Sequence, residues 1–225
     1  MVPTADDVTS WVHRVTHDER NETGARFRSI RTGALFPAAA EAFRRHGFTA
    51  VDRLSLLERS LVDRSLRRNT LPRYTATGRL HTRDYHVAAD IDADAFVGEW
   101  ANDAKSLSDI ADATPQHRSR IVADTSIPRS RWATPNLARA IGFAITGHAG
   151  HVGYLQRLAV RPSARRRGVG QYLVNDACRW LARRGSRTVM VNTGVDNDAA
   201  LALYERCGFT RLTTELVVLE LDLAG

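Results

Sequence analysis

The sequence predicts an α/β fold of the α+β kind, in which helices flank a mixed, twisted central sheet. Three observations lead to this prediction. Between residues 84 and 225, short apolar segments alternate with segments of helical period. A basic, glycine-rich turn at 165–170 joins an apolar segment to a helical one. A second helical segment, at 197–206, follows one apolar segment later.

The beginning of this region is expected to hold one strand and one helix. Residues 85–88 are interpreted as the first strand, and residues 93–112 follow a helical period. The acidic run at 90–94 suits the start of that helix, because carboxylates favour the positive end of the helix dipole. Residues 113–137 carry three prolines and many polar side chains. We therefore expect an irregular loop there that contacts the substrate and includes a short strand at about 120–122.

The remaining elements follow one another closely. The helix after the glycine-rich turn is the best marked, because its apolar residues share one face and Gly185 ends it. The residues of that face are Val169, Leu173, Val174, Ala177, Trp180 and Leu181. Strands are expected at 138–146, 152–160, 188–191 and 216–221, and the last helix at 197–206.

The composition is that of an ordinary globular protein. Of 225 residues, 43% are hydrophobic and 25% are charged, which allows a sizeable core. No apolar run reaches the roughly 18 residues of a transmembrane helix, and the N-terminus shows no signal-peptide pattern. Cys178 and Cys207 fit small, free core residues in a reducing compartment, so we expect a cytoplasmic protein that does not bind membranes.

The chain is also basic, with a formal net charge of +7 and Lys105 as its only lysine. Such a charge suits either an anionic ligand or a nucleic acid. The sequence has no zinc-finger spacing, no RNA-recognition signature and no clear helix-turn-helix. An anionic ligand is therefore the better explanation, and an Arg-rich nucleic-acid-binding module is kept as an alternative.

The turn at 165–170 has the composition of an anion site. The first turn of a helix offers free backbone N–H groups and the positive end of the dipole. We expect a pyrophosphate there, with the amides of residues 166–171 forming an anion nest. Gly168 and Gly170 would let the backbone approach the phosphates closely, where a Cβ atom would obstruct.

Two signatures in this region resemble those of the GCN5-related N-acetyltransferase (GNAT) family. Arg165-x-x-Gly168-x-Gly170 matches the acyl-CoA loop of the family. The second signature is matched by Asn197-x-x-Ala200-x-x-x-Tyr204-x-x-x-Gly208-Phe209. Both motifs in this order, with a strand between them, are more specific than either alone. The resemblance is sharp over about residues 138–221 and extends from about residue 84.

The resemblance implies an N-acetyltransferase that uses acetyl-CoA as acyl donor and needs no metal. In this family the strand before the loop splays from its parallel neighbour, which frees its backbone to pair with pantetheine and to polarise the thioester carbonyl. Tyr204 would be the general acid that protonates the departing thiolate. The implied cofactor-binding residues are Leu158, Ala159, Val160, Arg165, Arg166, Arg167, Gly168, Val169, Gly170, Gln171, Asn197 and Ala200.

The general base and the acceptor are not assigned by the sequence. Many relatives place a Glu on the central strand, whereas residues 153–157 contain no carboxylate. Candidate bases are His151, Glu99, Asp103 and Glu215. An amine of a small molecule or a protein would bind in a groove formed by residues 93–137 and 215, and would attack the thioester directly. The missing carboxylate keeps a non-catalytic acyl-CoA sensor as the alternative, and a homodimer is compatible with the sequence.

Residues 26–60 resemble a second copy of the last strand-helix-strand-strand portion of such a domain. At an offset of 161 residues, Gly47-Phe48 lies over Gly208-Phe209. In the same alignment Phe36 takes the place of Asn197, and Phe43 takes the place of Tyr204. Apolar rings cannot exchange protons or accept hydrogen bonds as a phenol and an amide do, so this copy lacks the chemistry.

The repeat leads to a prediction of the domain organisation. Residues 1–66 would form a degenerate half-domain that supports the catalytic domain. Residues 67–83, which are polar and contain a proline and a glycine, would form a linker. Residues 84–225 would form the complete catalytic domain.

Overall fold

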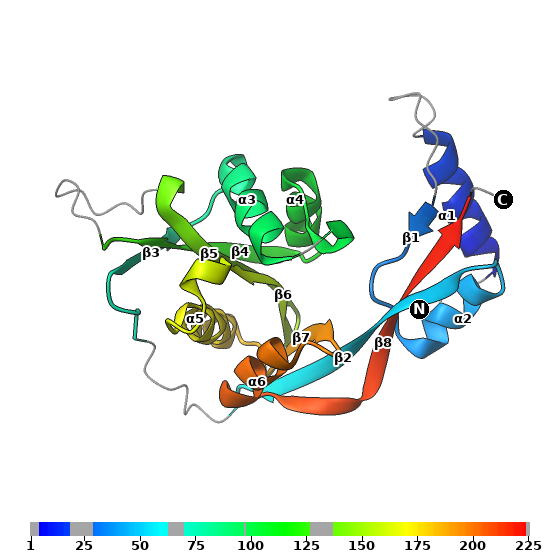
Figure 1. Cartoon of the computed structure of the whole chain (residues 1–225). Coiled ribbons are helices and arrows are strands. Elements are labelled where there is room, and N and C mark those ends of the chain that lie inside the picture. Colours follow the sequence, from blue (N-terminus) through cyan, green and yellow to red (C-terminus); the bar gives the residue numbers. More distant parts are fainter. Residues whose placement is uncertain (1–4, 19–28, 63–69, 97, 127–136, 224–225) are drawn as a thin grey trace. The chain divides into compact units, whose positions relative to one another are not determined.

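The computed structural model describes residues 5–18, 29–62, 70–96, 98–126 and 137–223 (Figure 1). These residues fall into two compact units. Unit 1 consists of Met1–Leu57, Asn192–Leu201 and Arg211–Gly225, and unit 2 of Glu58–Val191 and Ala202–Thr210. Unit 1 thus combines residues from both ends of the sequence, so the compact units do not follow one another along the chain.

Unit 2 is built on a mixed sheet with the strand order β7-β6-β5-β4-β3. Its strands are β3 (Thr75–Arg79), β4 (Gln116–Asp124), β5 (Ala140–Ala149), β6 (Val152–Val160) and β7 (Thr188–Gly194). Strand β6 pairs with β7 in parallel, and the other neighbours pair antiparallel. This confirms the predicted mixed α/β fold.

Helices cover both faces of this sheet (Figure 1). On one face lie α3 (Tyr85–Ala95) and α4 (Ala104–Asp112), and on the other lies α5 (Val169–Arg183). The apolar face predicted for α5 is buried throughout, and Gly185 follows the helix with a φ of +87°. The core beneath α3 and α4 includes Ile91, Leu107, Ile121, Phe143 and Ile145. Single turns of 3₁₀ helix occur at Thr82–Asp84, Gly98–Trp100, Leu137–Arg139 and Pro162–Ala164.

Unit 1 has the strand order β1-β8-β2 and its own small core. Its elements are α1 (Ala5–Asp18), β1 (Ser29–Arg31), α2 (Pro37–Arg44), β2 (Thr49–Ser60) and β8 (Thr210–Asp222). Strand β1 pairs antiparallel with β8, and Ser29 stands opposite Asp222. The core contains Val8, Ile30, Ala40, Phe48 and Leu219. The chain passes between the two units within α6 (Asp198–Arg206), after Leu201.

The start of the sheet region differs from the prediction. Residues 85–88 begin α3 and are not a strand, and the single helix predicted at 93–112 is two helices. Phe96, with φ −121° and ψ 140°, ends α3 in an extended conformation. The inner face of α3 includes Asp92, which is fully buried, so the apolar pattern that would have marked this helix is interrupted by a charged residue.

The acidic run at 90–94 therefore lies in the second half of α3 and does not start a helix. The helix dipole is unfavourable to carboxylates there. Two of these carboxylates instead form ion pairs with the sheet region, Asp92 with Arg157 and Asp94 with Arg161. These pairs supply the favourable interaction that the prediction had assigned to the dipole.

Parts of the predicted linker and loop are ordered strands. Residues 75–79, within the predicted linker, form β3 and pair with β4 at the edge of the sheet. The short strand predicted at 120–122 is the nine-residue β4. Three parts of the predicted segments lie outside the described residues. They are 127–136 of the loop, 67–69 of the linker and 26–28 of the repeat.

Both cysteines are buried and free, as the sequence indicated. Burial raises the pKa of the Cys178 thiol to about 12 and also raises that of Cys207, so neither is a thiolate nucleophile at neutral pH. Within the part of the chain that the structure describes, no helix is long and apolar enough to cross a membrane.

Candidate active site

Strands β6 and β7 separate at the centre of unit 2. Their parallel pairing covers Val152 to Tyr154 against Thr188 to Met190, and the described residues show no β6–β7 pairing beyond that point. On its other side β6 stays paired with β5 as far as Val160, which stands opposite Gly142. The C-terminal half of β6 therefore has one edge open.

The pairing with β5 determines which backbone groups line the open edge. Arg161 donates its backbone N–H to the carbonyl of Ile141 at 2.9 Å. In an antiparallel pair, hydrogen-bonded and non-hydrogen-bonded residues alternate, so Ala159 is bonded to β5 whereas Leu158 and Val160 are not. The N–H and C=O groups of Leu158 and Val160 consequently point into the gap. Of the three residues predicted on this strand, two offer free backbone groups.

A β-bulge lies just before this open edge. Ile145 stands opposite Arg157 and Thr146 opposite Leu155, so Gln156 is the extra residue of β6. The side chain of Gln156 donates to the carbonyl of Ile110 in α4 at 2.5 Å. Bulges bend a strand and increase its twist, and this one re-aims β6 where it parts from β7.

The glycine-rich turn forms a concave backbone nest. Arg166 and Gly168 have φ values of +62° and +83°, with Arg167 between them at negative φ. Alternation of left- and right-handed residues turns successive N–H groups toward one point, which suits an anion. Gly168 is also the N-cap of α5, and no side chain caps this helix. Among the described residues, the amides of 166–171 have no backbone hydrogen-bond partner, so they are available to an anion, as the predicted nest requires.

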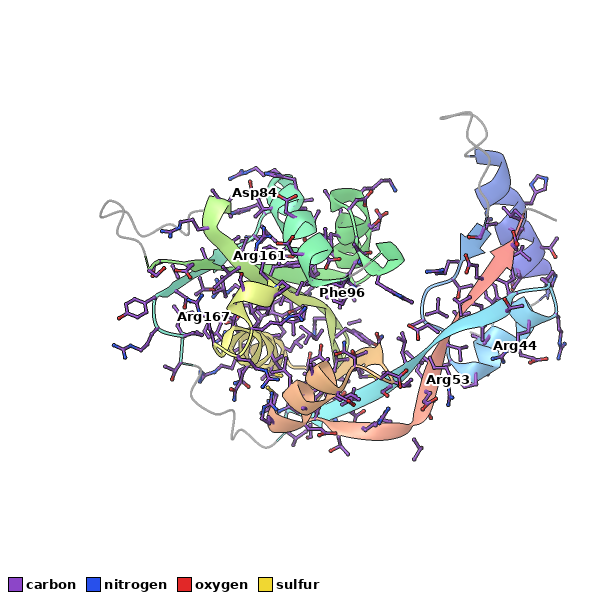
Figure 2. All side chains as sticks on the ribbon, in the orientation of Figure 1. Arg44, Arg53, Asp84, Phe96, Arg161 and Arg167 are labelled. Carbon is purple, nitrogen blue, oxygen red and sulfur yellow. The ribbon has the colours of Figure 1, made fainter. Side chains whose placement is uncertain are left out.

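The three arginines of the turn have different surroundings, and Figure 2 marks Arg167 on this turn. Arg165 donates to the carbonyl of Ala95 at 3.1 Å, and Arg167 pairs with Asp124 at 2.9 Å. Arg166 is exposed and makes no hydrogen bond or ion pair with the described residues. Hydrogen bonds from Ser126, followed by the one from Arg167, lower the pKa of Asp124 to about 2. Only Arg166 is thus uncommitted to a protein partner.

The two glycines of the motif serve different purposes. Gly168 has space around it, because an added Cβ would lie 3.8 Å from Pro72, and its requirement is the positive φ. Gly170 lies against α6, because an added Cβ would come within 3.1 Å of a methyl group of Leu203. Close packing of α5 on α6 is therefore one reason for a glycine at position 170, and the close approach to phosphate stays a prediction. The neighbouring Val169 side chain is in the core, and Gln171 is exposed.

Tyr204 follows Leu203 on α6 and is 5% exposed. Its ring packs on Phe209, with centroids 5.8 Å apart. Burial raises the pKa of Tyr204 well above its ordinary value, and Cys207 adds to this, whereas the nearby Arg157 cation lowers it. The phenol is therefore protonated at neutral pH, as a proton donor must be.

Asn197 and Ala200 belong to the residues of unit 1 and sit at the start of α6. The Asn197 side chain accepts a hydrogen bond from the Ala200 N–H at 3.1 Å. This is helix N-capping. Both residues stay predicted acetyl-CoA contacts.

Sequence reasoning missed the buried ion pair between Asp92 of α3 and Arg157 of β6. Arg157 binds both carboxylate oxygens, with Nε–Oδ1 at 2.8 Å and Nη2–Oδ2 at 2.6 Å. Asn102 adds two hydrogen bonds to Oδ2, from its backbone N–H and its side-chain amide. Arg157 also donates to the Trp100 carbonyl at 2.7 Å and lies 3.8 Å from the ring centroid of Phe96, which Figure 2 marks at the end of α3. The residues are 65 positions apart, so no local pattern reveals the pair.

The predicted bases are placed as follows. His151 is exposed in the β5–β6 turn, about 23 Å of strand away from Leu158. Asp103 caps α4, and the hydrogen bond from the Ser106 N–H lowers its pKa. Glu215 belongs to unit 1, where it pairs with Arg53 at 2.5 Å. The side chain of Glu99 lies outside the described residues. The structure thus adds no support for any of the four, and the base stays unassigned.

Unit 2 therefore combines a splayed strand pair, an anion nest at a helix N-terminus and a buried phenol, which are the features expected of a site for a long anionic thioester. Comparison with known proteins agrees with this class. The sequence pattern of the Acetyltransferase (GNAT) family matches residues 89–209, more than half of the chain. The chain belongs to the GNAT acetyltransferase family.

Individual relatives match a smaller part of the chain than the family pattern does. A mycothiol acetyltransferase from Arthrobacter sp. (strain FB24) is 34% identical over 85 residues, which cover 35% of this chain and 26% of that protein. The chain matches only about a quarter of the length of its curated relatives.

Two solved structures show the shared fold. A tandem GNAT protein from the clavulanic acid biosynthesis pathway has a TM-score of 0.62 at 11% identity, covering 97% of this chain and 70% of its own. A chain of the NatC complex bound to Gag peptide and CoA has a TM-score of 0.50 at 26% identity, covering 67% of this chain and 99% of its own.

Proposed function

We propose that the protein is an N-acetyltransferase that transfers the acetyl group of acetyl-CoA to an amine by direct attack. The observation that carries the proposal is the open edge of β6, which leads through the turn at 161–168 to the N-terminus of α5, where no side chain caps the helix. Free backbone groups of Leu158 and Val160 are arranged to pair with the amides of pantetheine. The nest at 166–171 and the exposed Arg166 are arranged to bind the pyrophosphate.

The reaction can be balanced with these groups. The amine nitrogen attacks the thioester carbon, and a backbone N–H on the open edge stabilises the negative charge on the carbonyl oxygen. As the carbon–sulfur bond breaks, Tyr204 gives its proton to the leaving thiolate. The proton lost by the attacking amine leaves through a group that we do not assign, and a proton returns to Tyr204. Arg157, whose charge acts on Tyr204, favours the transient phenolate.

The acceptor class is not set by the relatives, because the matched part covers only a fraction of each. The experiment is a thiol-release assay with acetyl-CoA and a panel of small amines and peptides, using wild-type protein and Tyr204→Phe. Loss of general acid catalysis typically costs about 10²- to 10⁴-fold in rate, so we expect kcat to fall with acetyl-CoA affinity unchanged. Acetyl-CoA binding without turnover on any amine would favour the acyl-CoA sensor, and salt-sensitive DNA or RNA binding without acetyl-CoA binding would favour the nucleic-acid module.

We also propose that residues 1–66 descend from a duplicated half-domain that lost its chemistry. Two glycines that align in the repeat, Gly47 and Gly208, both have φ +83°. Phe43 packs on Phe48 with centroids 5.3 Å apart, as Tyr204 packs on Phe209.

Backbone bonds around the two turns also correspond. Phe48 donates to the Phe43 carbonyl at 3.3 Å, and Phe209 donates to the Tyr204 carbonyl at 3.0 Å. The functional positions differ, because Phe36 provides no side-chain cap for α2 whereas Asn197 caps α6. These local similarities support a shared origin, with the boundaries 1–66, 67–83 and 84–225 as its predicted extent.

A further inference from the structure

Residues 72–75 lie beside the turn that forms the anion nest. A Cβ added at Gly168 would be 3.8 Å from Cγ of Pro72. Thr75 stands opposite Asp124 in the β3–β4 pair, and the Asp124 carboxylate binds Arg167 of the turn at 2.9 Å. Two independent contacts therefore place this segment next to the predicted pyrophosphate site.

Tyr74, within this segment, has a conformation and an exposure that the fold does not explain. Its φ is +56°, a left-handed value that is uncommon for a bulky residue and costs about 1–3 kcal/mol. The residue is nevertheless 62% exposed, so packing of its side chain does not offset this cost. Strained residues of this kind gather at ligand-binding positions.

The surroundings hold the Tyr74 backbone and one side of its ring in place. The Tyr74 carbonyl accepts a hydrogen bond from the Thr125 N–H at 2.8 Å, and the Thr75 hydroxyl donates to the Pro72 carbonyl at 2.5 Å. The Arg73 guanidinium lies 5.6 Å from the centroid of the Tyr74 ring. The ring is thus a supported platform with most of its surface in solvent.

The reach from the nest to this platform suits a nucleotide. Tyr74 is two residues from Pro72, at most about 7 Å of chain. In coenzyme A a single ribose separates the pyrophosphate from the adenine. A base stacked on an aromatic side chain contributes about 1–3 kcal/mol, and the contact requires only a free aromatic face.

We propose that Tyr74 is the stacking platform for the adenine of acetyl-CoA when the pyrophosphate occupies the nest at 166–171. The proposal rests on the proposed function, since it assigns a residue to one end of the same ligand. It also gives Arg73 a role. Its guanidinium would keep its contact with the Tyr74 ring and would lie near the ribose of coenzyme A, which carries a phosphate group.

Calorimetric titration of two ligands tests this assignment. Acetyl-CoA carries the adenosine, whereas acetyl-4′-phosphopantetheine lacks it. The variants are Tyr74→Gly, which removes the ring and accepts the positive φ, and Tyr74→Phe, which keeps the ring. Phe36→Ala, which removes another exposed aromatic ring, at a residue of unit 1 outside the proposed site, is the matched control.

We expect Tyr74→Gly to weaken acetyl-CoA binding about 5- to 150-fold. The same variant should bind acetyl-4′-phosphopantetheine like the wild type and should be at least as stable to heat, because the strain is gone. Tyr74→Phe and Phe36→Ala should bind both ligands like the wild type. If Tyr74→Gly weakened the binding of both ligands equally, or of neither, the stacking role of Tyr74 would be overturned while the proposed function would stand. Failure of the wild-type protein to bind either ligand would overturn the proposed function as well.

Discussion

Replacing Asp92 by Asn is expected to destabilise the protein by about 3–5 kcal/mol, the usual cost of leaving one member of a buried ion pair without its partner. The Asp92 side chain is completely buried and that of Arg157 is 17% exposed, so water can compensate the remaining cation only slightly. Asparagine keeps the shape but loses the charge and one of the two oxygens that Arg157 binds. For a chain of this length each kcal/mol corresponds to about 2–4 °C, which predicts a fall in Tm of roughly 6–20 °C.

The assay is urea and thermal unfolding at neutral pH, with two comparison variants. Asp109→Asn breaks an ion pair with Lys105 at the surface, where the Asp109 side chain is 66% and the Lys105 side chain 85% exposed. This variant should lose at most about 0.5 kcal/mol of stability. Asp92→Asn/Arg157→Met removes both charges and should recover a large part of the stability lost in the single variant. A cost below 1 kcal/mol for Asp92→Asn, or a double variant less stable than the single one, would refute the reasoning.

Three further predictions concern the nest and its supports. Because the pKa of Asp124 is lowered in the folded protein, the contribution of its carboxylate to stability is complete above about pH 4 and is lost as the pH falls toward about 2. Urea unfolding should therefore show that the stability difference between wild type and Asp124→Asn vanishes over that range. Gly170→Val should destabilise by about 1–3 kcal/mol through overpacking against Leu203, whereas in Gly170→Ala the helix propensity of alanine offsets the tighter contact. Gly47→Ala and Gly208→Ala should each cost about 1–2 kcal/mol in thermal unfolding, because both positions require the same left-handed backbone; a tolerated substitution at one of them would contradict the proposed equivalence.

The second half of the chain was predictable because its signals are local. The apolar face of α5, the stop at Gly185 and the strands around the turn all follow from patterns within one element, and the structure confirms them. The resemblance also indicated the separation of β6 from β7. Local conformation explains the turn as well, since a glycine-rich segment before a helix suggests left-handed residues and free amides.

The first half was harder because its decisive interactions are long-range. A buried Asp92 interrupts the apolar face of α3, and its charge is compensated by Arg157 of β6 and by hydrogen bonds from Asn102. The polar sequence of β3 resembles a linker, yet pairing with β4 makes it an edge strand. Unit 1 combines residues from both ends of the sequence, and only long-range contacts establish that grouping.

The most direct test of the central claim is calorimetric titration of acetyl-CoA into the wild-type protein and into Gly168→Asp. The variant places a carboxylate and a Cβ at the left-handed N-cap of α5, where we expect the pyrophosphate to bind. We expect a dissociation constant on the order of micromolar for the wild type and no measurable binding for the variant, with circular dichroism confirming that the variant is folded. Equal binding by both proteins, or no binding by the wild type, would contradict the assignment of the turn as the acyl-CoA site.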